Sequence, residues 1–280
     1  MPILYLLLIL QAGLVITGGA VRITGSGLGC PTWPECTPGS YTPVPYQAEG
    51  QLHAWIEFGN RLLTFALLFS ALVAVIYVLK SGRKDLRSLA AGQVLGIFGQ
   101  GILGGITVLT DLHPLPVAGH LLLSMLLIAG ATSLYSRRHE PQIKVAAPTK
   151  TISVLSQAHI AISFIVLILG TIVTGSGPHA GDEKAQRFGF DIQTVAWIHA
   201  DVVIFLLGTT FAFFVATGTT QATKRRLKIF TVIALAQGAI GYIQYFTGIP
   251  EVLVAAHLLG ATLVWIAAWR VWLSVTTRNG

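Results

Sequence analysis

The sequence predicts an all-α integral membrane protein whose eight transmembrane helices form two pseudo-symmetric four-helix bundles. Of its 280 residues, 53% are hydrophobic and 10% are charged, and the mean hydropathy is +0.71. A chain of this composition cannot cover itself with polar surface. Apolar runs of about 20 residues, enough to cross roughly 30 Å of hydrocarbon, recur along the whole chain. We expect them to form helices over residues 1–20, 54–79, 89–109, 117–136, 152–173, 195–217, 229–247 and 252–273.

The basic residues indicate how these helices are oriented. Of the 18 Lys and Arg residues, 14 lie in the connections from even to odd helices or at the chain's end. They are Lys80, Arg83, Lys84, Arg87, Arg137, Arg138, Lys144, Lys150, Lys224, Arg225, Arg226, Lys228, Arg270 and Arg278. Positive residues concentrate on the cytoplasmic side, so we expect both termini in the cytoplasm. The net charge of +7 then reflects topology, and we expect no nucleic-acid partner.

The first apolar segment indicates in which membrane the protein is located. No basic stretch precedes this segment and no small-residue cleavage site follows it, so we expect a retained helix and not a signal peptide. A multi-pass protein of a bacterial plasma membrane is the simplest interpretation.

An internal repeat divides the chain into two halves. The Thr-Gly-Ser-Gly motif at residues 24–27 recurs at 174–177, and residues 100–120 align without a gap on residues 237–257. Because each half has an even number of helices, we expect a parallel repeat. The predicted units are an N-terminal bundle at 1–136, a cytoplasmic linker at 137–151 and a C-terminal bundle at 152–280.

Two long outer segments, at residues 21–52 and 174–194, are rich in Gly, Pro, Thr and Ser, so we expect them to carry function. The first contains Cys30 and Cys36, the only cysteines of the chain. A pair on the oxidising side of a membrane favours a disulfide over two free thiols. The spacing is equally compatible with a structural and with a redox-active disulfide.

Four histidines form the candidate metal-binding set: His53, His120, His199 and His257. Each lies near the start of an even helix, so we expect all four at a similar depth near the outer face. An ionisable residue within a membrane indicates function, and paired histidines on facing helices suit six-coordinate haem. Zinc usually takes three or four close ligands, so paired histidines favour haem.

Glu57 is the candidate catalytic residue. His53, Glu57 and Asn60 are spaced i, i+4 and i+7, so their side chains share one helix face. A carboxylate beside a haem edge could exchange protons during oxidation. The alternative is an ion pair between Glu57 and Arg61, although Arg61 could instead bind a haem propionate.

Residues 18–31, with the sequence GGAVRITGSGLGCP, lead to Trp33 and Cys36, and Glu57 and Arg61 follow. These motifs closely resemble the haem A synthase family, and the likeness covers nearly the full length. Members of that family oxidise the C8 methyl group of haem O to the formyl group of haem A by successive hydroxylations. The resemblance implies a haem b cofactor on His199 and His257, and haem O as substrate near His120 and Glu57.

One position departs from the family, because many relatives have a histidine where this chain has Asn60. We therefore predict that His53 pairs with His120 across the substrate haem. The alternative is a five-coordinate haem held by His120 alone.

The expected partners are the lipid bilayer, a haem O synthase and an electron-transfer protein. The competing functions are a dihaem b-type electron-transfer cytochrome, and a haem chaperone or exporter, which would use the same pockets. A pure electron carrier would need neither Glu57 nor the cysteine segment.

Overall fold

The computed structural model describes residues 2–138 and 148–276, so most of the predicted linker and Arg278 lie outside it. Within these ranges the regular structure is helical, apart from one isolated bridge between Thr37 and Ser40. The long helices are α1 (Pro2–Ile23), α2 (Gln51–Lys80), α3 (Arg87–Leu109), α4 (Pro114–Arg137), α5 (Lys150–Ser176), α6 (Ile192–Val215), α7 (Gln221–Phe246) and α8 (Glu251–Leu273). A short 3-10 helix, η1 (Lys84–Leu86), precedes α3. Each of the eight long helices in the described ranges is apolar enough to cross a membrane, which confirms the prediction of an all-α membrane protein.

The predicted start of α7 was wrong. We expected a helix from residue 229, but α7 begins at Gln221, so its four basic residues lie in its first two turns and not in a loop. Thr220 caps the helix by accepting a hydrogen bond from the Thr223 N–H at 3.2 Å. Lys and Arg are good helix formers, and hydropathy does not register a helix that continues beyond the hydrocarbon.

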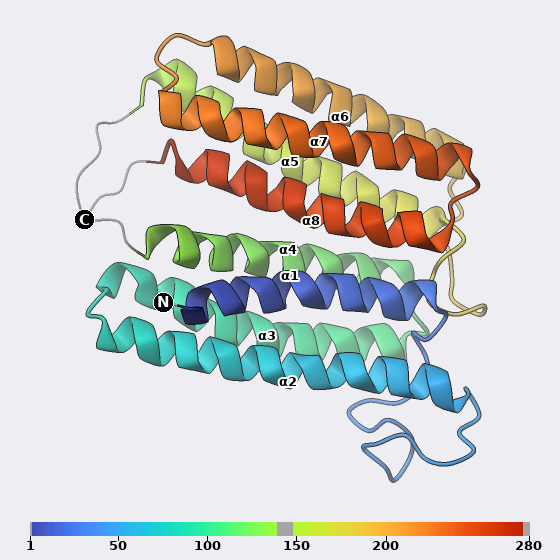
Figure 1. The fold of residues 1–280 in the computed structure, drawn as a ribbon. Helices are drawn as coiled ribbons and strands as arrows, with labels where there is room; N and C mark the ends of the chain where they lie inside the picture. Colours follow the sequence, from blue (N-terminus) through green and yellow to red (C-terminus); the bar gives the residue numbers. More distant parts are fainter. Residues whose placement is uncertain (1, 139–147, 277–280) are drawn as a thin grey trace.

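The helices form two groups of four, one above the other in Figure 1. In the first group, α1 contacts α2, α2 contacts α3, α3 contacts α4, and α4 returns to α1. Helices α5 to α8 repeat this cyclic order, and the groups meet where α4 contacts α5 and α8, and where α1 contacts α8. Exchanging α1–α4 for α5–α8 leaves this pattern of neighbours unchanged. Helix α1 begins and α8 ends at the same end of the molecule (Figure 1).

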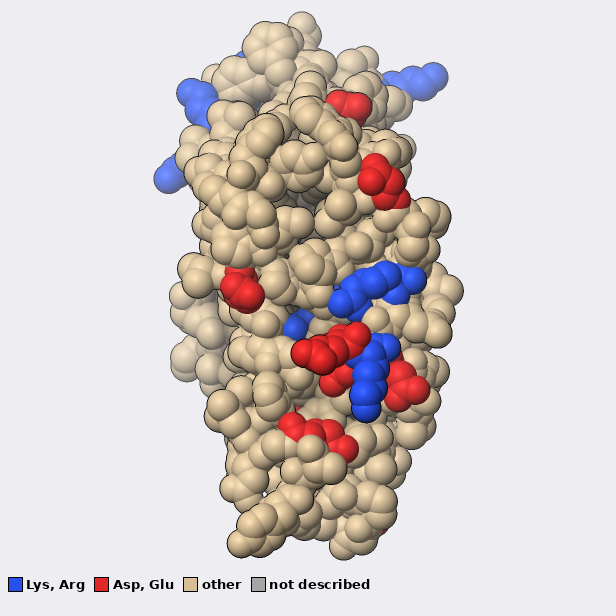
Figure 2. Space-filling model, turned by 90° about the vertical axis from the view of Figure 1, so that its right-hand side faces the viewer, with Lys and Arg blue, Asp and Glu red and all other residues tan. Residues whose placement is uncertain are grey.

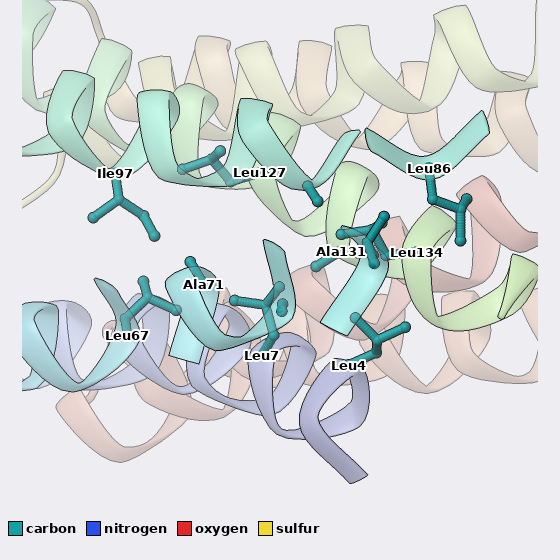
Figure 3. Close-up of a cluster of buried hydrophobic side chains, with 12 residues drawn as sticks. Leu4, Leu7, Leu67, Ala71, Leu86, Ile97, Leu127, Ala131 and Leu134 are labelled. Atoms are coloured by element: carbon teal, nitrogen blue, oxygen red, sulfur yellow. The ribbon is translucent and has the colours of Figure 1, made fainter. Parts of the chain in front are cut away.

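Each group has its own apolar core in the half that carries the chain ends. In the first, Leu4 and Leu7 of α1 form one cluster with Leu67 and Ala71 of α2 and with Leu127 and Leu134 of α4 (Figure 3). Alanines in this cluster allow close approach of the helices, which stabilises packing where lipid offers no hydrophobic driving force. In contrast, many large apolar side chains face outward, including Phe65, Phe69 and Leu95. Such a surface suits a bilayer.

Hydrogen bonds from two tryptophans of α8 join the groups within the membrane. The indole N–H of Trp265 donates to the Met125 carbonyl and that of Trp269 to the Ser133 hydroxyl, both at 2.7 Å. Both acceptors lie on α4. The relative position of α4 and α8 is therefore fixed by directional contacts as well as by packing.

Arg22, at the end of α1, joins the groups at the opposite end of the molecule. Its Nε donates to the His179 carbonyl at 2.5 Å and its Nη2 to the Thr174 carbonyl at 2.8 Å. Nearby, the Gly27 N–H donates to the Gly181 carbonyl at 2.9 Å. The two outer segments of the chain are thus held together by backbone acceptors on the second group.

We expect Arg22→Ala to lower the apparent melting temperature of the detergent-purified protein by about 5 °C or more, because two charged hydrogen bonds between the groups are lost. Thermal unfolding followed by tryptophan fluorescence measures this change. Arg225→Ala, at an exposed position of α7, is the matched control and should change it little. Equal melting temperatures for the two variants would contradict a role for Arg22 in joining the groups.

Candidate functional site

Three of the four candidate histidines lie against a glycine of the preceding helix. A Cβ atom added to Gly104, Gly170 or Gly241 would lie 3.2, 3.4 or 3.0 Å from Cε1 of His120, His199 or His257, respectively. Each imidazole therefore presses its edge onto the backbone of an odd helix, at a place where a larger residue would displace it. Glycine at these positions allows the imidazole to approach the backbone closely.

The histidines lie on helices that are diagonal to each other within their groups. In the cycle α5, α6, α7, α8, contacts join neighbours, so α6 and α8 face each other across the middle of the bundle. His199 belongs to α6 and His257 to α8. In the first group α2 and α4 are diagonal in the same way, and His120 lies on α4. Diagonal helices leave more room between facing side chains than neighbouring helices do.

In each of these three imidazoles, one buried ring nitrogen has no hydrogen-bond partner among the described residues. This atom is Nδ1 in His120, in His199 and in His257. A buried polar atom without a partner is unfavourable and indicates a functional site. His159 of α5 differs, because both of its ring nitrogens are buried and unpartnered in this way. Its ring packs edge-on against Phe213 and Phe230, so this histidine is enclosed by apolar side chains.

A repeated glutamine contact sets the position of two of these histidines. Nε2 of Gln100 on α3 donates to the His120 carbonyl at 3.1 Å, and Nε2 of Gln237 on α7 donates to the His257 carbonyl at 2.7 Å. The two glutamines begin the gap-free alignment between the halves. Each bond fixes the register of an odd helix against the following even helix at the level of the histidine.

In α2, the residue that lies next to a glycine of the preceding helix is Asn60 and not His53. A Cβ atom on Gly18 of α1 would lie 3.9 Å from Nδ2 of Asn60. Thr17, the preceding residue, donates its hydroxyl to Oδ1 of Asn60 at 2.7 Å. This contact could not be predicted, because nothing in the spacing relates residue 17 to residue 60.

His53 lies at the junction between α2 and the first outer segment. Its Nδ1 shares a hydrogen bond of 2.9 Å with the hydroxyl of Ser26. The backbone of Gly29 packs directly on the carbonyl of His53, so any side chain at position 29 would collide with it. The structure therefore holds His53 by contacts with the outer segment, whereas His120, His199 and His257 have contacts with neighbouring helices.

Glu57 and Arg61 form the ion pair that was the alternative to a catalytic carboxylate. Oε1 of Glu57 accepts hydrogen bonds from Nη2 and Nε of Arg61 at 2.5 and 3.1 Å, and Oε2 accepts from the Cys30 N–H at 2.7 Å. Glu57 is only 6% exposed. Both carboxylate oxygens therefore have partners, as a buried charge requires.

Arg61 also binds the backbone of the cysteine segment, residues 30–36. Its two terminal nitrogens donate to the carbonyls of Cys30, Thr32 and Glu35 at 2.8 to 3.2 Å. The guanidinium lies 5.3 Å from the ring centroid of Trp33, which packs on Gly105 of α3. The ion pair on α2 thus holds this segment over the end of the first bundle.

Cys30 and Cys36 are fully buried, and their sulfur atoms lie 2.05 Å apart. Gln47 contacts this pair, donating through Nε2 to the Gly29 carbonyl and to Sγ of Cys36. Around this segment, the outer end of the molecule carries basic and acidic side chains side by side, without a continuous field of one sign (Figure 2).

The start of α6 places His199 relative to the second outer segment. Asp191 caps this helix by accepting hydrogen bonds from the N–H and hydroxyl of Thr194 at 2.8 and 2.7 Å. The hydroxyl hydrogen bond and then the backbone one hold the pKa of the Asp191 carboxyl below its usual range. The cap fixes where α6 begins and therefore how deep His199 lies.

The described residues form eight apolar helices in two cyclic groups. Histidines on the even helices lie against glycines of the neighbouring odd helices. These features define a multi-pass membrane protein with histidines in the interior of its bundles. The family model described as Cytochrome oxidase assembly protein, COX15-CtaA, matches residues 2–181. The chain belongs to this family.

The individual proteins to which this chain is similar include several named Heme A synthase. One from Shewanella oneidensis is 32% identical over 176 residues, which are 58% of this chain and 51% of that protein. This alignment therefore spans about half of the relative. Heme A synthase of Sinorhizobium fredii is 26% identical, covering 92% of this chain and 85% of the relative, and that of Rhizorhabdus wittichii is 25% identical, covering 94% and 91%.

We expect Arg61→Ala to speed reduction of the Cys30 and Cys36 pair by at least tenfold, because the guanidinium's hydrogen bonds to the Cys30, Thr32 and Glu35 carbonyls are lost, together about 1.4 kcal/mol or more. Mass shift on alkylation after timed exposure to a reductant measures this rate. Arg87→Ala, exposed near the other end of the molecule, is the matched control. Unchanged kinetics in Arg61→Ala would show that burial of the sulfurs, and not the guanidinium, protects the pair.

Proposed function

We propose that this protein is a haem A synthase, oxidising the C8 methyl group of haem O to the formyl group of haem A by successive hydroxylations. The observation that carries this proposal is the near full-length similarity to proteins named Heme A synthase, combined with histidines in matching surroundings in both halves. The lipid bilayer is its setting, and haem O is its substrate. A methyl carbon must lose electrons at each stage, so the protein also needs an electron-transfer partner.

We assign haem b to His199 and His257 in the second bundle. Both imidazoles are on diagonal helices, both have an unpartnered Nδ1, and both lie against glycines that leave room at the backbone. This donor set fits a bis-histidine haem. Haem b bound there would supply one-electron transfer. The protein's own contribution is to fix both ring positions, through Gly170 on one side and through Gly241 and Gln237 on the other.

We place the substrate haem in the first bundle, near His120 and Glu57. His120 has the same glycine and glutamine contacts as His257, which supports a binding role. Glu57 is buried on α2, the helix diagonal to α4, one turn from Asn60. Its role as catalytic carboxylate stays a proposal, because both of its oxygens bind Arg61 and the cysteine segment in this structure. A propionate would have to compete with those contacts to bind Arg61.

The proposed topology has the basic end of the molecule in the cytoplasm of a bacterium and the two outer segments across the plasma membrane. Basic residues at the ends of α2 and α4 and at the start of α7 lie at the end of the molecule where α1 begins. This arrangement supports cytoplasmic termini by the positive-inside rule. We further propose that Cys30 and Cys36 form a disulfide on the oxidising side, and that a haem O synthase delivers the substrate.

Expression of the full chain in a bacterial host that makes haem O but no haem A should produce haem A. Chromatography and mass spectrometry of extracted haems measure it. An empty vector gives the background. If haem O stays unchanged although the protein is present in the membrane and binds haem, the electron-carrier function replaces the enzyme.

His199→Ala and His257→Ala should each remove a low-spin b-type spectrum from the purified protein, because two opposed imidazoles produce it. Absorbance and electron paramagnetic resonance measure this loss. His159→Ala is the matched control: it removes a buried histidine of the same bundle and should leave the spectrum in place. A retained low-spin spectrum in both single variants would overturn the haem b assignment.

Glu57→Ala should abolish haem A formation while the low-spin haem b signal stays. Glu57→Gln keeps the shape and one oxygen that can accept from Arg61, but it removes the charge and the acceptor for the Cys30 N–H. It should also lose at least tenfold in rate if proton exchange is the role. Haem chromatography of membranes with matched protein levels gives both results. Full activity in Glu57→Gln would show that the carboxylate serves only to hold Arg61 and the cysteine segment.

A further inference from the structure

We propose that Asn60 occupies, in the first bundle, the place that an axial histidine occupies in the second, so that the substrate haem is held through His120 alone. Its opposite face then lies open to a small exogenous ligand, beside the amide of Asn60. This inference rests on the proposed function, because it takes the first bundle as the haem O site.

The register of four helix pairs carries the assignment. In α3 with α4, α5 with α6 and α7 with α8, one glycine of the odd helix faces an imidazole of the even helix. In α1 with α2, the glycine is Gly18 and the residue that faces it is Asn60. In every pair, one polar side chain of the even helix therefore lies next to a glycine of the preceding odd helix, with Asn60 at 3.9 Å and the imidazoles at 3.0 to 3.4 Å from a Cβ added to that glycine.

The chemistry of the amide makes this pair different from the other three. Haem iron is held in proteins by imidazole, thiolate, thioether or phenolate, and a neutral carboxamide is not among these ligands. Oδ1 of Asn60 accepts the Thr17 hydroxyl at 2.7 Å, and this bond orients the amide. The NH2 group on Nδ2 lies toward Gly18, so neither polar atom of this side chain is an iron ligand of the kind that an imidazole supplies.

His53 is displaced from this position along the helix. It precedes Asn60 by seven residues on the same face of α2, which is about 10 Å nearer the outer end by helical rise. Its Nδ1 is engaged with Ser26, and its backbone is covered by Gly29. The prediction that His53 pairs with His120 would require the haem to lie out of register with the glycine contact of His120.

The consequence is a functional difference between two similar bundles. A haem with two imidazoles is coordinatively saturated and suits electron transfer, whereas a haem with one imidazole can bind a further small molecule at the iron. The bundle that contains Glu57 and is covered by the cysteine segment is the one with the open position. The chain therefore separates substrate oxidation from electron transfer by a single side chain in α2.

Spectroscopy of the ferric protein tests this assignment independently of turnover. The full chain is purified from a host that supplies haem O, and ferric haem b is added to one equivalent if the first bundle is empty. We expect one high-spin haem that becomes low-spin on adding imidazole, and one low-spin haem that does not respond. His120→Ala should remove the high-spin signal alone.

Asn60→His should convert the high-spin signal to low-spin without added imidazole and weaken imidazole binding at least tenfold. His53→Ala is the matched control and should leave the high-spin signal unchanged. If Asn60→His does not fold, Asn60→Gln tests the same place: it should keep the high-spin signal and alter imidazole affinity.

Two low-spin haems in the unaltered chain, one of which becomes high-spin in His53→Ala, would overturn the inference and establish His53 as the ligand. Haem chromatography of the same preparation separates this failure from that of the proposed function. Haem A together with two low-spin haems overturns only the role of Asn60. A high-spin haem without haem A overturns only the enzyme.

Discussion

An imidazole pressed against a backbone glycine is the contact on which the arrangement of this protein depends. Within hydrocarbon a polar ring must be enclosed by protein, and helices can enclose it tightly only where one of them lacks a side chain. The pairs Gly104 with His120 and Gly241 with His257 meet this requirement. Each pair also restricts how far an odd helix can slide along the next even helix, since most other residues of the odd helix would place a Cβ against the ring.

The bundle order follows from these pairwise contacts. Short connections join α3 to α4 and α7 to α8, so each of these pairs can pack without contacts from the other group. Gln100 and Gln237 add a hydrogen bond to the histidine's own carbonyl, which ties backbone register to ring position. The tryptophans of α8 and the Arg22 contacts then join two units whose interiors are already arranged. Function can differ between the halves because each interior is set locally.

Much of the architecture could be predicted from the sequence, since hydropathy gives the spans and polar residues within spans give candidate sites. The start of α7 was wrong because Lys224 and Arg225 are read as loop by hydropathy, although they extend a helix beyond the lipid. The choice between His53 and Asn60 could not be made from the repeat. Offsets between the halves change between motifs, and both residues share one helix face. Our proposal favours Asn60 because of the position of α1 against α2, where Gly18 faces Asn60, and the sequence does not reveal that contact.

Burial of Glu57 and Arg61 connects the outer segment to the first bundle. A charged pair removed from water needs partners for every donor and acceptor, and α2 alone cannot supply them. Residues 30–36 provide the rest, through the Cys30 N–H and three backbone carbonyls. The segment is therefore a part of the site and not a surface loop. Any change that releases it, including reduction of the cysteine pair, would leave Glu57 and Arg61 with fewer partners one turn from Asn60. If the first bundle holds the substrate haem as we propose, release of this segment would affect both the carboxylate and the haem face beside Asn60.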